Sequence, residues 1–254
     1  MSSPLISIVM PCYNAEKYVE SAVKSVMAQT YRNWELLIVN DCSADGSAAI
    51  VRRYAQSDCR VKYFDNAVNS GVAASRNKGV AQADGDYVAF LDADDIWQPS
   101  KLERQVAFML EKGCAISYTA HGFIDEDGRT CGRVYYPPGE VDYNRFLRSN
   151  VMCASSVMTD ARIMKSTGFS GDVFHEDFTA WLAIVKAHGS GRGIAEPLTM
   201  YRVIRGSKSD NKLVSARGVY NIYRRHLRLG ALTSLWCMLF YTYNGLKKYS
   251  LRKS

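Results

Sequence analysis

The sequence predicts an α/β protein: a single Rossmann-like domain with a central, mostly parallel sheet flanked by helices, followed by a helical C-terminal tail. Over the first hundred residues, apolar runs with the composition of buried strands alternate with segments of helical periodicity, as in parallel sheets. The charge also changes along the chain. The residues from Tyr201 onward contain twelve Lys and Arg and one Asp, a net charge of +11. The whole chain carries +7, so residues 1–200 carry −4.

Four strands and three helices are predicted in alternation before residue 92. Runs rich in β-branched and aromatic residues predict the strands, and apolar residues at helical spacing predict the helices. Asn14 is a good N-cap for the first helix, Asp45 opens the second, and Asn69 begins the third. The predicted strands are 5–10, 34–39, 61–64 and 87–91, and the predicted helices end near residues 27, 54 and 83.

The second half is predicted to begin with a helix over residues 101–112, against which Trp97 packs, and a strand over residues 115–120. The dipeptide Asp127-Gly128 predicts a hairpin turn with solvated acidic residues. The seven cysteines have no zinc-site spacing, so we expect them to be reduced thiols of a cytosolic protein.

Three carboxylates follow the fourth predicted strand, at Asp92, Asp94 and Asp95. Burying bare carboxylates is costly, so we expect Asp92 and Asp94 to emerge at the C-terminal edge of the sheet, where open α/β sheets bind ligands. Two oxygen donors there suit Mg²⁺ or Mn²⁺, which share their coordination with substrate phosphates. A solvated acidic turn is the alternative, and Asp95 is interpreted as a turn residue.

Tyr13 and Asp41 follow the first two predicted strands and should reach the same edge. A phenol ring can stack on a base, and a carboxylate can accept the N–H of a pyrimidine. Neither a Gly-x-Gly-x-x-Gly segment nor a P-loop occurs in the sequence. These residues together with a bound metal fit a nucleoside diphosphate.

Five segments in the first hundred residues resemble, in order, the motifs of family-2 glycosyltransferases, which have the GT-A fold. They are Ser7–Asn14, Gln29–Glu35, Asn40–Ser47, Gly71–Asn77 and Phe90–Asp95. Two later regions are similar to the family's Glu-Asp helix and closing loop: His175–Leu182, and Tyr201-Arg202 with Ser207–Lys212. Within the family, the chain looks closest to bacterial enzymes that build teichoic acids, capsules and O-antigens. The resemblance makes residues 1–212 the catalytic domain and leaves 213–254 as a basic helical tail.

This resemblance implies a role for each matching position. Asp41 would accept the base N–H, and Arg76 would lie near the nucleotide, with a solvated helix residue as the alternative. Asn40 replaces the first of two acids that the family often has, which leaves the base contact of Asp41 unaffected. The implied nucleotide-binding residues are Pro11, Tyr13, Asn14, Asp41, Arg76 and Asp92, and the implied metal ligands are Asp94 and Asp92.

The resemblance also implies a catalytic carboxylate. An inverting transfer needs a base on the face of the sugar opposite the leaving diphosphate, and the match assigns this role to Asp177, with Glu176 as the second choice. The alternative is a pair of acids favoured by the dipole at a helix start. His175 is interpreted as a hydrogen-bonding neighbour, and residues 150–158 as candidates for acceptor contact.

The tail is predicted to contain two helices, the second within the uncharged residues 229–246. Its apolar residues fall on one face with basic residues at both ends, which is typical of a helix lying in a membrane interface. Packing on the protein's own sheet or on a second subunit is the alternative. The predicted membrane-docking residues are Arg224, Arg225, Arg228, Trp236, Phe240, Lys247 and Lys248.

These expectations combine into a metal-dependent inverting hexosyltransferase. It would use Mn²⁺ or Mg²⁺ to transfer a hexose from a UDP-sugar to a polyprenyl-diphosphate-linked saccharide, as a peripheral protein on the cytoplasmic face of the inner membrane. The charge distribution does not suit a nucleic-acid binder, and a homodimer is left open. The alternatives are a non-catalytic membrane-surface nucleotide-binding module and a nucleotidyltransferase, although the latter would need a Gly-rich basic loop after the first strand.

Overall fold

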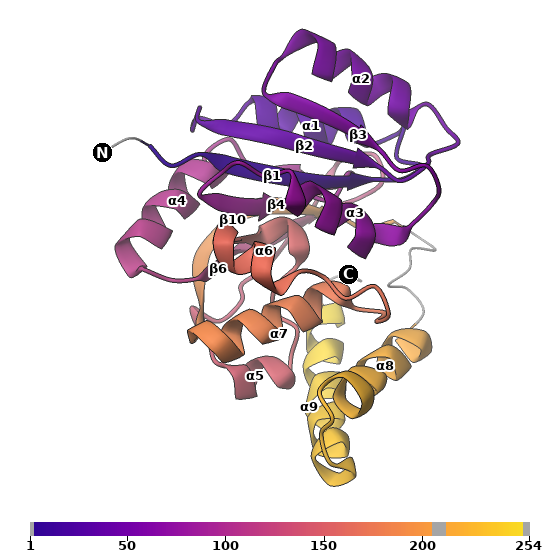
Figure 1. Ribbon diagram of the computed structural model, residues 1–254. Coiled ribbons are helices and arrows are strands. Elements are labelled where there is room, and N and C mark those ends of the chain that lie inside the picture. Colours follow the sequence, from indigo (N-terminus) through magenta and orange to yellow (C-terminus); the bar gives the residue numbers. More distant parts are fainter. Residues whose placement is uncertain (1–2, 205–211, 251–254) are drawn as a thin grey trace.

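The computed structural model describes residues 3–204 and 212–250. A central sheet organises the molecule (Figure 1), and within the described residues it has ten strands. The strand order is β3-β2-β1-β4-β9-β6-β10-β5, with β7 paired to β6 and β8 paired to β10. The strands are β1 (Ile6–Cys12), β2 (Trp34–Asn40), β3 (Val61–Asp65), β4 (Tyr87–Phe90), β5 (Ile96–Trp97), β6 (Ile116–Ile124), β7 (Thr130–Tyr135), β8 (Glu140–Val141), β9 (Val157–Asp160) and β10 (Gly191–Arg202).

The first four strands are parallel, which confirms the predicted alternation. Strand β1 pairs with β2 on one side and with β4 on the other, and β2 pairs with β3. Every residue of β2 is buried, because helices cover both faces of this half of the sheet. The C-terminal ends of β1, β2 and β4 therefore meet at one edge, where the predicted ligand-binding residues follow them.

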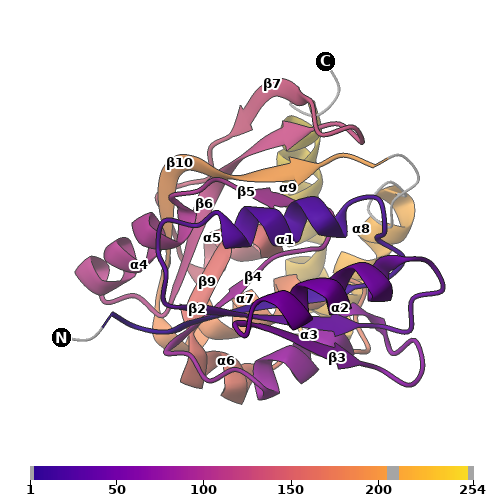
Figure 2. The same ribbon diagram turned by 90° about the horizontal axis from the view of Figure 1, so that it is seen from above.

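Helices form a layer on each face of the sheet (Figures 1 and 2). On one face, α1 (Val19–Met27), α2 (Ser47–Ser57) and α4 (Lys101–Lys112) share an apolar cluster with β1 and β2. The opposite face is covered by α3 (Gly71–Ala81), α5 (Tyr143–Leu147), α6 (Ala161–Thr167) and α7 (Glu176–His188).

The second half of the sheet departs from the sequence-based prediction. Strand β9 runs antiparallel between β4 and β6, and neither β9 nor β10 was predicted as a strand. Strand β10 pairs in parallel with β6, with register shifts between Ile194, Pro197 and Thr199. These irregularities remove the alternation by which a strand is recognised. Strand β6 extends four residues beyond the predicted end, to Ile124.

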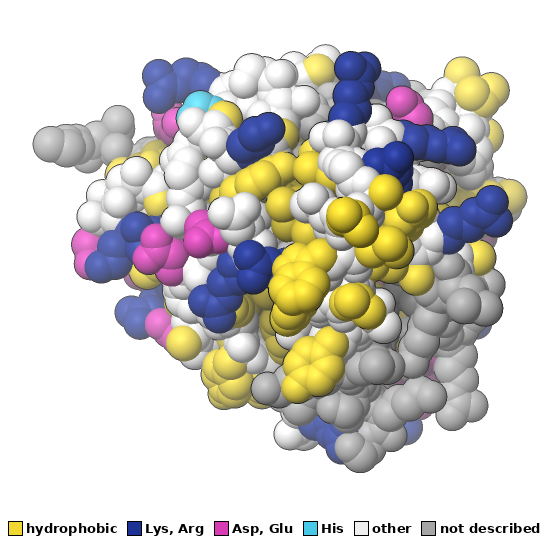
Figure 3. All heavy atoms as spheres, turned by 90° about the horizontal axis from the view of Figure 1, so that it is seen from below, with side chains coloured by type: hydrophobic (Ala, Val, Ile, Leu, Met, Phe, Trp, Pro, Cys, Tyr) yellow, Lys and Arg dark blue, Asp and Glu magenta, His cyan; other side chains and the backbone are white. Residues whose placement is uncertain are grey.

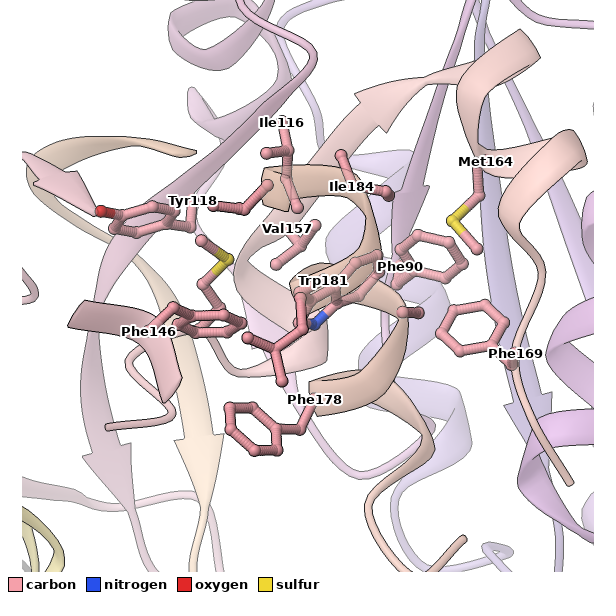
Figure 4. Close-up of a cluster of buried hydrophobic side chains, with 14 of the residues drawn as sticks. Phe90, Ile116, Tyr118, Phe146, Val157, Met164, Phe169, Phe178, Trp181 and Ile184 are labelled. Atoms are coloured by element: carbon pink, nitrogen blue, oxygen red, sulfur yellow. The ribbon is translucent and has the colours of Figure 1, made fainter. Parts of the chain in front are cut away.

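A group of aromatic rings fixes α7 against β4 (Figure 4). The ring of Trp181 lies 5.4 Å from that of Phe90 and 5.6 Å from that of Phe169. Phe90 and Phe169 also meet edge to face at 5.3 Å, a favoured arrangement of aromatic pairs. Because Trp181 is fully buried, the start of α7 is held in a fixed position relative to the end of β4.

Three C-terminal helical segments pack against the same side as α7. They are α8 (Lys212–Asn221), a π-helical turn (Ile222–His226) and α9 (Ala231–Ser250). Val219, Ile222 and Tyr223 are fully buried within the cluster that contains Trp181. The hydroxyl of Tyr223 donates a hydrogen bond to the backbone carbonyl of Leu147. The helix predicted within residues 229–246 also contributes to this cluster, through buried Cys237 and through Tyr241, whose ring lies 5.8 Å from that of Phe178 on α7. It therefore packs on α7 of the same chain, whereas the alternative prediction named the sheet or a second subunit.

The opposite side of α9 faces outward. Leu232, Leu235, Trp236, Leu239 and Tyr243 are more than half exposed, and Figure 3 shows apolar side chains gathered on this face with basic side chains around them. We call these five residues the α9 apolar face. Over the parts of the chain that the structure describes, a search for a helix with the length and apolarity of a membrane span finds none.

Two expectations about local structure are wrong. Asn14 does not cap the first helix: α1 begins at Val19, with Tyr18 as its N-cap. Asn14 adopts a left-handed backbone conformation (φ 46°), and its side-chain oxygen accepts the N–H of Ala44 at 2.9 Å. Its amide is therefore used to join the loops after β1 and β2. The acidic hairpin residues are also not all solvated, because Asp125 is half-buried and accepts the N–H of Arg129.

Candidate active site

A cavity of about 590 Å³ opens beyond the C-terminal ends of β1 and β4. Loops after these strands, one face of α3, the start of α7 and the second half of α9 all contribute to its wall. The cavity brings together residues separated by more than 160 positions in the sequence. The predicted residues that line it are Tyr13, Arg76, Asp92, Asp94, Glu176 and Asp177.

Three predicted nucleotide-binding residues do not line this cavity. Pro11 is half-buried within β1, and Asn14 joins two loops as described above. Asp41 is 3% exposed, and its carboxylate accepts the backbone N–H groups of Ser70 and Gly71 at 2.9 and 2.8 Å. Asp41 also accepts a hydrogen bond from the Asn66 side chain. In this structure Asp41 holds the loop that starts α3, and its role toward a base stays a prediction.

Arg76 on α3 links the two halves of the cavity. Its guanidinium donates to Asp92 at 2.6 Å and to Glu176 at 2.7 Å. Arg76 is 3% exposed, so the alternative of a solvated helix residue is wrong. Burial alone would lower the pKa of Arg76, but the adjacent carboxylates of Asp92 and Glu176 raise it. The arginine is therefore charged and neutralises carboxylates assigned to two different functions.

Asp92 and Asp94 face the cavity together. Burial, followed by the negative charge of Asp92, raises the pKa of Asp94 to about 6. Asp95 points elsewhere: its buried carboxylate accepts the Ser155 hydroxyl at 2.5 Å and the N–H of Arg202 at 2.8 Å. Its backbone N–H closes a turn by donating to the carbonyl of Asp92 at 3.1 Å, but its side chain is 1% exposed and is not solvated.

Two residues fix this acidic loop in a role that the sequence did not indicate: Ser155, predicted only as a candidate for acceptor contact, and Arg202, which lies in the segment that resembles the closing loop. The Ser155 hydroxyl also accepts the N–H of Asp92 at 3.0 Å, and its carbonyl accepts the indole N–H of Trp97 at 2.7 Å. Arg202, at the end of β10, donates to the carbonyl oxygen of Asp94 at 2.7 Å. Trp97 is buried under Lys101 of α4, as predicted. The loop geometry therefore depends on two distant segments of the chain, around Ser155 and around Arg202.

The start of α7 supplies the catalytic candidates. Glu176 is 7% exposed and paired with Arg76, whereas Asp177 is partly exposed on the cavity wall. One oxygen of Asp177 accepts the N–H of Phe178 at 2.7 Å. The imidazole Nε2 of His175 lies 2.9 Å from the Ser215 hydroxyl, in agreement with its interpretation as a hydrogen-bonding neighbour. Of the two acids, Asp177 has the better access to a substrate.

The donor set of this cavity fits a divalent cation that also binds a diphosphate. Asp92 and Asp94 are two carboxylates whose mutual repulsion a cation would relieve. Among the described residues, no group of three or more His, Cys, Asp or Glu side chains is placed to hold a metal. Mg²⁺ and Mn²⁺ sites with only one or two protein carboxylates are completed by water and substrate phosphates. The residues present thus fit a metal shared with the substrate.

The fold and this cavity define a glycosyltransferase of the GT-A type. Residues 7–162 match the family described as "Glycosyl transferase family 2". This match covers more than half of the chain, so the protein belongs to glycosyltransferase family 2.

The chain is also similar to named proteins over nearly its whole length. It is 36% identical to TuaG of Bacillus subtilis, named for teichuronic acid biosynthesis, over 96% of this chain and 97% of the relative. It is 32% identical to the Escherichia coli UDP-Glc:alpha-D-GlcNAc-diphosphoundecaprenol beta-1,3-glucosyltransferase WfgD, over 98% and 97%. The solved structure of the mannosyltransferase PcManGT of Pyrobaculum calidifontis, in complex with GDP-Man and Mn²⁺, superposes with a TM-score of 0.67. That superposition has 18% identity and covers 94% of this chain and 73% of the other, so it supports the fold alone.

Proposed function

We propose that the protein is a metal-dependent inverting hexosyltransferase that uses a UDP-sugar donor and a lipid-linked, polyprenyl-diphosphate saccharide as acceptor in bacterial surface polysaccharide synthesis. One observation carries the proposal: a single cavity contains an exposed aromatic ring, two carboxylates suited to a metal, and a partly exposed carboxylate at a helix start. These are the groups needed for a nucleotide, a diphosphate and an acceptor hydroxyl.

The donor side of the cavity is formed by Tyr13, Asp92 and Asp94. Tyr13 is 52% exposed at the rim, where its ring is available to stack on a base. A divalent cation bound by Asp92 and Asp94 would neutralise the diphosphate leaving group as a Lewis acid. The name of WfgD supports UDP as the nucleotide, and the Mn²⁺ in the mannosyltransferase complex supports a divalent cation.

Asp177 is proposed as the general base. It would accept the proton of the acceptor hydroxyl while that oxygen attacks the anomeric carbon from the side opposite the diphosphate. The attack forms one glycosidic bond, breaks the bond to the diphosphate and inverts the anomeric centre. Glu176 cannot readily serve because its charge is held by Arg76 at 2.7 Å. Arg76 instead fixes the position of Glu176, and thereby of the neighbouring Asp177, relative to Asp92 on the other side of the cavity.

The C-terminal helices are proposed to hold the enzyme on the cytoplasmic face of the cell membrane as a peripheral protein. The α9 apolar face is exposed, and Arg224, Arg225 and Arg228 lie exposed just before α9. Basic residues add about 1 kcal/mol each near an anionic surface, and apolar side chains add more when they insert. Phe240 is half-buried, so Trp236 is the better placed aromatic. The side chains of Lys247 and Lys248, and residues 207–211, lie outside the described residues.

The decisive experiment is transfer from UDP-glucose to N-acetylglucosamine linked to a short-chain lipid diphosphate, with and without Mn²⁺. We expect metal-dependent product with inverted anomeric configuration. Asp94→Asn should abolish both transfer and the thermal stabilisation of the protein by UDP with Mn²⁺. Because burial opposes the charge of Asp94, this neutral variant should fold at least as well as the wild type. The exposed hairpin variant Asp127→Asn is the control, and wild-type activity of Asp94→Asn would contradict the proposal.

A further inference from the structure

A second cavity, of about 890 Å³, adjoins the active-site cavity. Its wall is formed by the segment after β7, by α5 and by α9. Ser149 and Asn244 line both cavities, so the two spaces meet at these side chains. The Asn244 amide donates to the backbone carbonyl of Arg148 at 3.1 Å, which fixes α9 beside the junction. A substrate that extends beyond the first cavity at this point enters the second.

The second cavity has positive charge available for an anion. Arg145 and Arg148 are exposed, and neither forms an ion pair with a carboxylate among the described residues. Of the nearby acids, Glu140 pairs with Arg192 at 2.5 Å. Asp142 lines the same cavity and caps α5 by accepting the backbone N–H of Arg145 at 2.7 Å. The two arginines therefore outweigh the one carboxylate on the cavity wall. Guanidinium groups bind phosphate oxygens through charge-assisted hydrogen bonds.

Aromatic and proline side chains form the rest of the wall. Tyr136 is 61% exposed, and Tyr135 and Pro137 lie beside it in the sequence. Phe240 of α9 closes the other side, with its ring 5.9 Å from the guanidinium carbon of Arg148. Trp236 and Leu239 of the α9 apolar face lie within one turn of Phe240 and point outward. The cavity therefore leads from the catalytic cavity to the exposed apolar helix.

We propose that the second cavity binds the diphosphate of the lipid-linked acceptor, with Arg145 and Arg148 contacting its oxygens and Tyr136 packing on the adjacent sugar or lipid. This inference rests on the proposed function. In an acceptor with a single sugar, the reacting hydroxyl and the diphosphate are attached to different carbons of the same ring. With the hydroxyl at Asp177 in the first cavity, the diphosphate reaches the second, and the lipid continues along α9 toward the membrane.

Binding of decyl diphosphate to the full-length protein tests this site directly. Saturating UDP and Mn²⁺ occupy the donor site, so the remaining binding reports the second cavity. We expect Arg145→Gln with Arg148→Gln to raise the dissociation constant by about 10- to 100-fold, the usual effect of losing hydrogen bonds to a charged group. Arg53→Gln, an exposed arginine on α2 at the opposite end of the sheet, should leave it unchanged. Equal affinities of the wild type and the double variant would overturn the assignment.

Kinetics with two acceptors test whether the two arginines recognise the diphosphate, another part of the acceptor or membrane headgroups. The double variant should raise KM for dodecyl-diphosphate-linked N-acetylglucosamine, and leave KM for dodecyl N-acetylglucosaminide and for the UDP-sugar unchanged. Equal increases for both acceptors would overturn recognition of the diphosphate. An unchanged KM with reduced binding to phosphatidylglycerol vesicles would assign the arginines to membrane headgroups instead. If no UDP-sugar is transferred at all, the proposed function fails, while the decyl diphosphate measurement still decides this inference.

Discussion

Arg76 is the residue on which the charge balance of the cavity depends. It is almost fully buried and contacts both Asp92, assigned to the donor, and Glu176, beside the proposed base. Its Nε is a buried donor without a hydrogen-bond partner among the described residues. The buried positive charge of Arg76 is therefore stabilised mainly by these two ion pairs. A buried charge that loses its partner costs far more than an exposed one. Any change at Arg76 should therefore affect folding before it affects chemistry.

We expect Arg76→Met to lower the free energy of unfolding by about 3–5 kcal/mol, because Glu176 would remain buried without its counter-charge. Chemical denaturation followed by circular dichroism measures this change. Arg104→Met is the matched control, since Arg104 pairs with Glu196 at 2.6 Å while 57% exposed. That loss should stay within about 1 kcal/mol. Similar losses in the free energy of unfolding for both variants would show that the buried ion pairs stabilise the protein no more than an exposed one.

Asp177→Asn keeps the shape of the proposed base and removes its capacity to accept a proton. We expect the transfer rate to fall by about two to four orders of magnitude, with UDP affinity close to that of the wild type. Stopped-flow or radiolabel transfer assays and calorimetric UDP binding provide the two readouts. A collapse of UDP affinity would instead make Asp177 a nucleotide-binding or structural residue. Glu176→Gln is the comparison, because it should lose stability through its broken pair with Arg76.

At the scale of the single element, α9 has two unlike faces. Its buried side includes Ser234 and Cys237, while the larger apolar residues Trp236 and Leu239 point outward. A helix usually buries its most apolar stripe, so this reversed arrangement supports the proposal that the outward face docks on a membrane. The regular spacing in the sequence identified which residues share a face. It could not tell which face would meet the body, since that depends on tertiary contacts such as the packing of Tyr241 on Phe178.

Substitution of Trp236 and Leu239 by Ser tests the outward face of α9. Both side chains are more than half exposed, so the melting temperature should change little. Burial of such a side chain contributes about 1.5–3 kcal/mol, and each substitution should therefore weaken binding to anionic vesicles by about tenfold or more. Cosedimentation measures this effect, with Thr242→Ala on the same helix as the control. Unchanged vesicle binding would point to a protein partner or to exposure without function.

The predictions from the sequence agree best with the structure for features that a short segment of the chain determines by itself. The four parallel strands, the acidic end of β4 and the start of α7 could all be predicted from short segments. The link between Arg76 and Glu176 spans 100 residues, and no pattern in either segment indicates it. The same applies to Ser155 and Arg202, whose contacts with the acidic loop arise only when β9 and β10 join the sheet. Strand β10 itself was missed because its register shifts break the alternation.

At the scale of the whole molecule, the boundary between catalytic domain and tail is less sharp than the change in composition suggests. Residues 213–254 were predicted as a separate basic tail, and their charge does set them apart. However, Val219, Ile222 and Tyr223 belong to the hydrophobic cluster that holds α7. Phe178, in the first turn of α7, lies 6.5 Å from Tyr223 between ring centres. The position of the proposed base is therefore coupled to the packing of the tail.

A chain that ends at residue 211 should fail to fold cooperatively. It would lack three fully buried apolar side chains of α8 and the π-helical turn, and expose the surface of α7 that they cover. At about 1.5–3 kcal/mol for each side chain, the loss is about 4.5–9 kcal/mol, which is comparable to the whole stability of many domains. Calorimetry and binding of a hydrophobic dye measure the effect, and a chain ending at Ser250 is the control. Wild-type melting and UDP binding of the shorter chain would instead establish residues 1–212 as an independent domain, with the C-terminal helices merely docked on it.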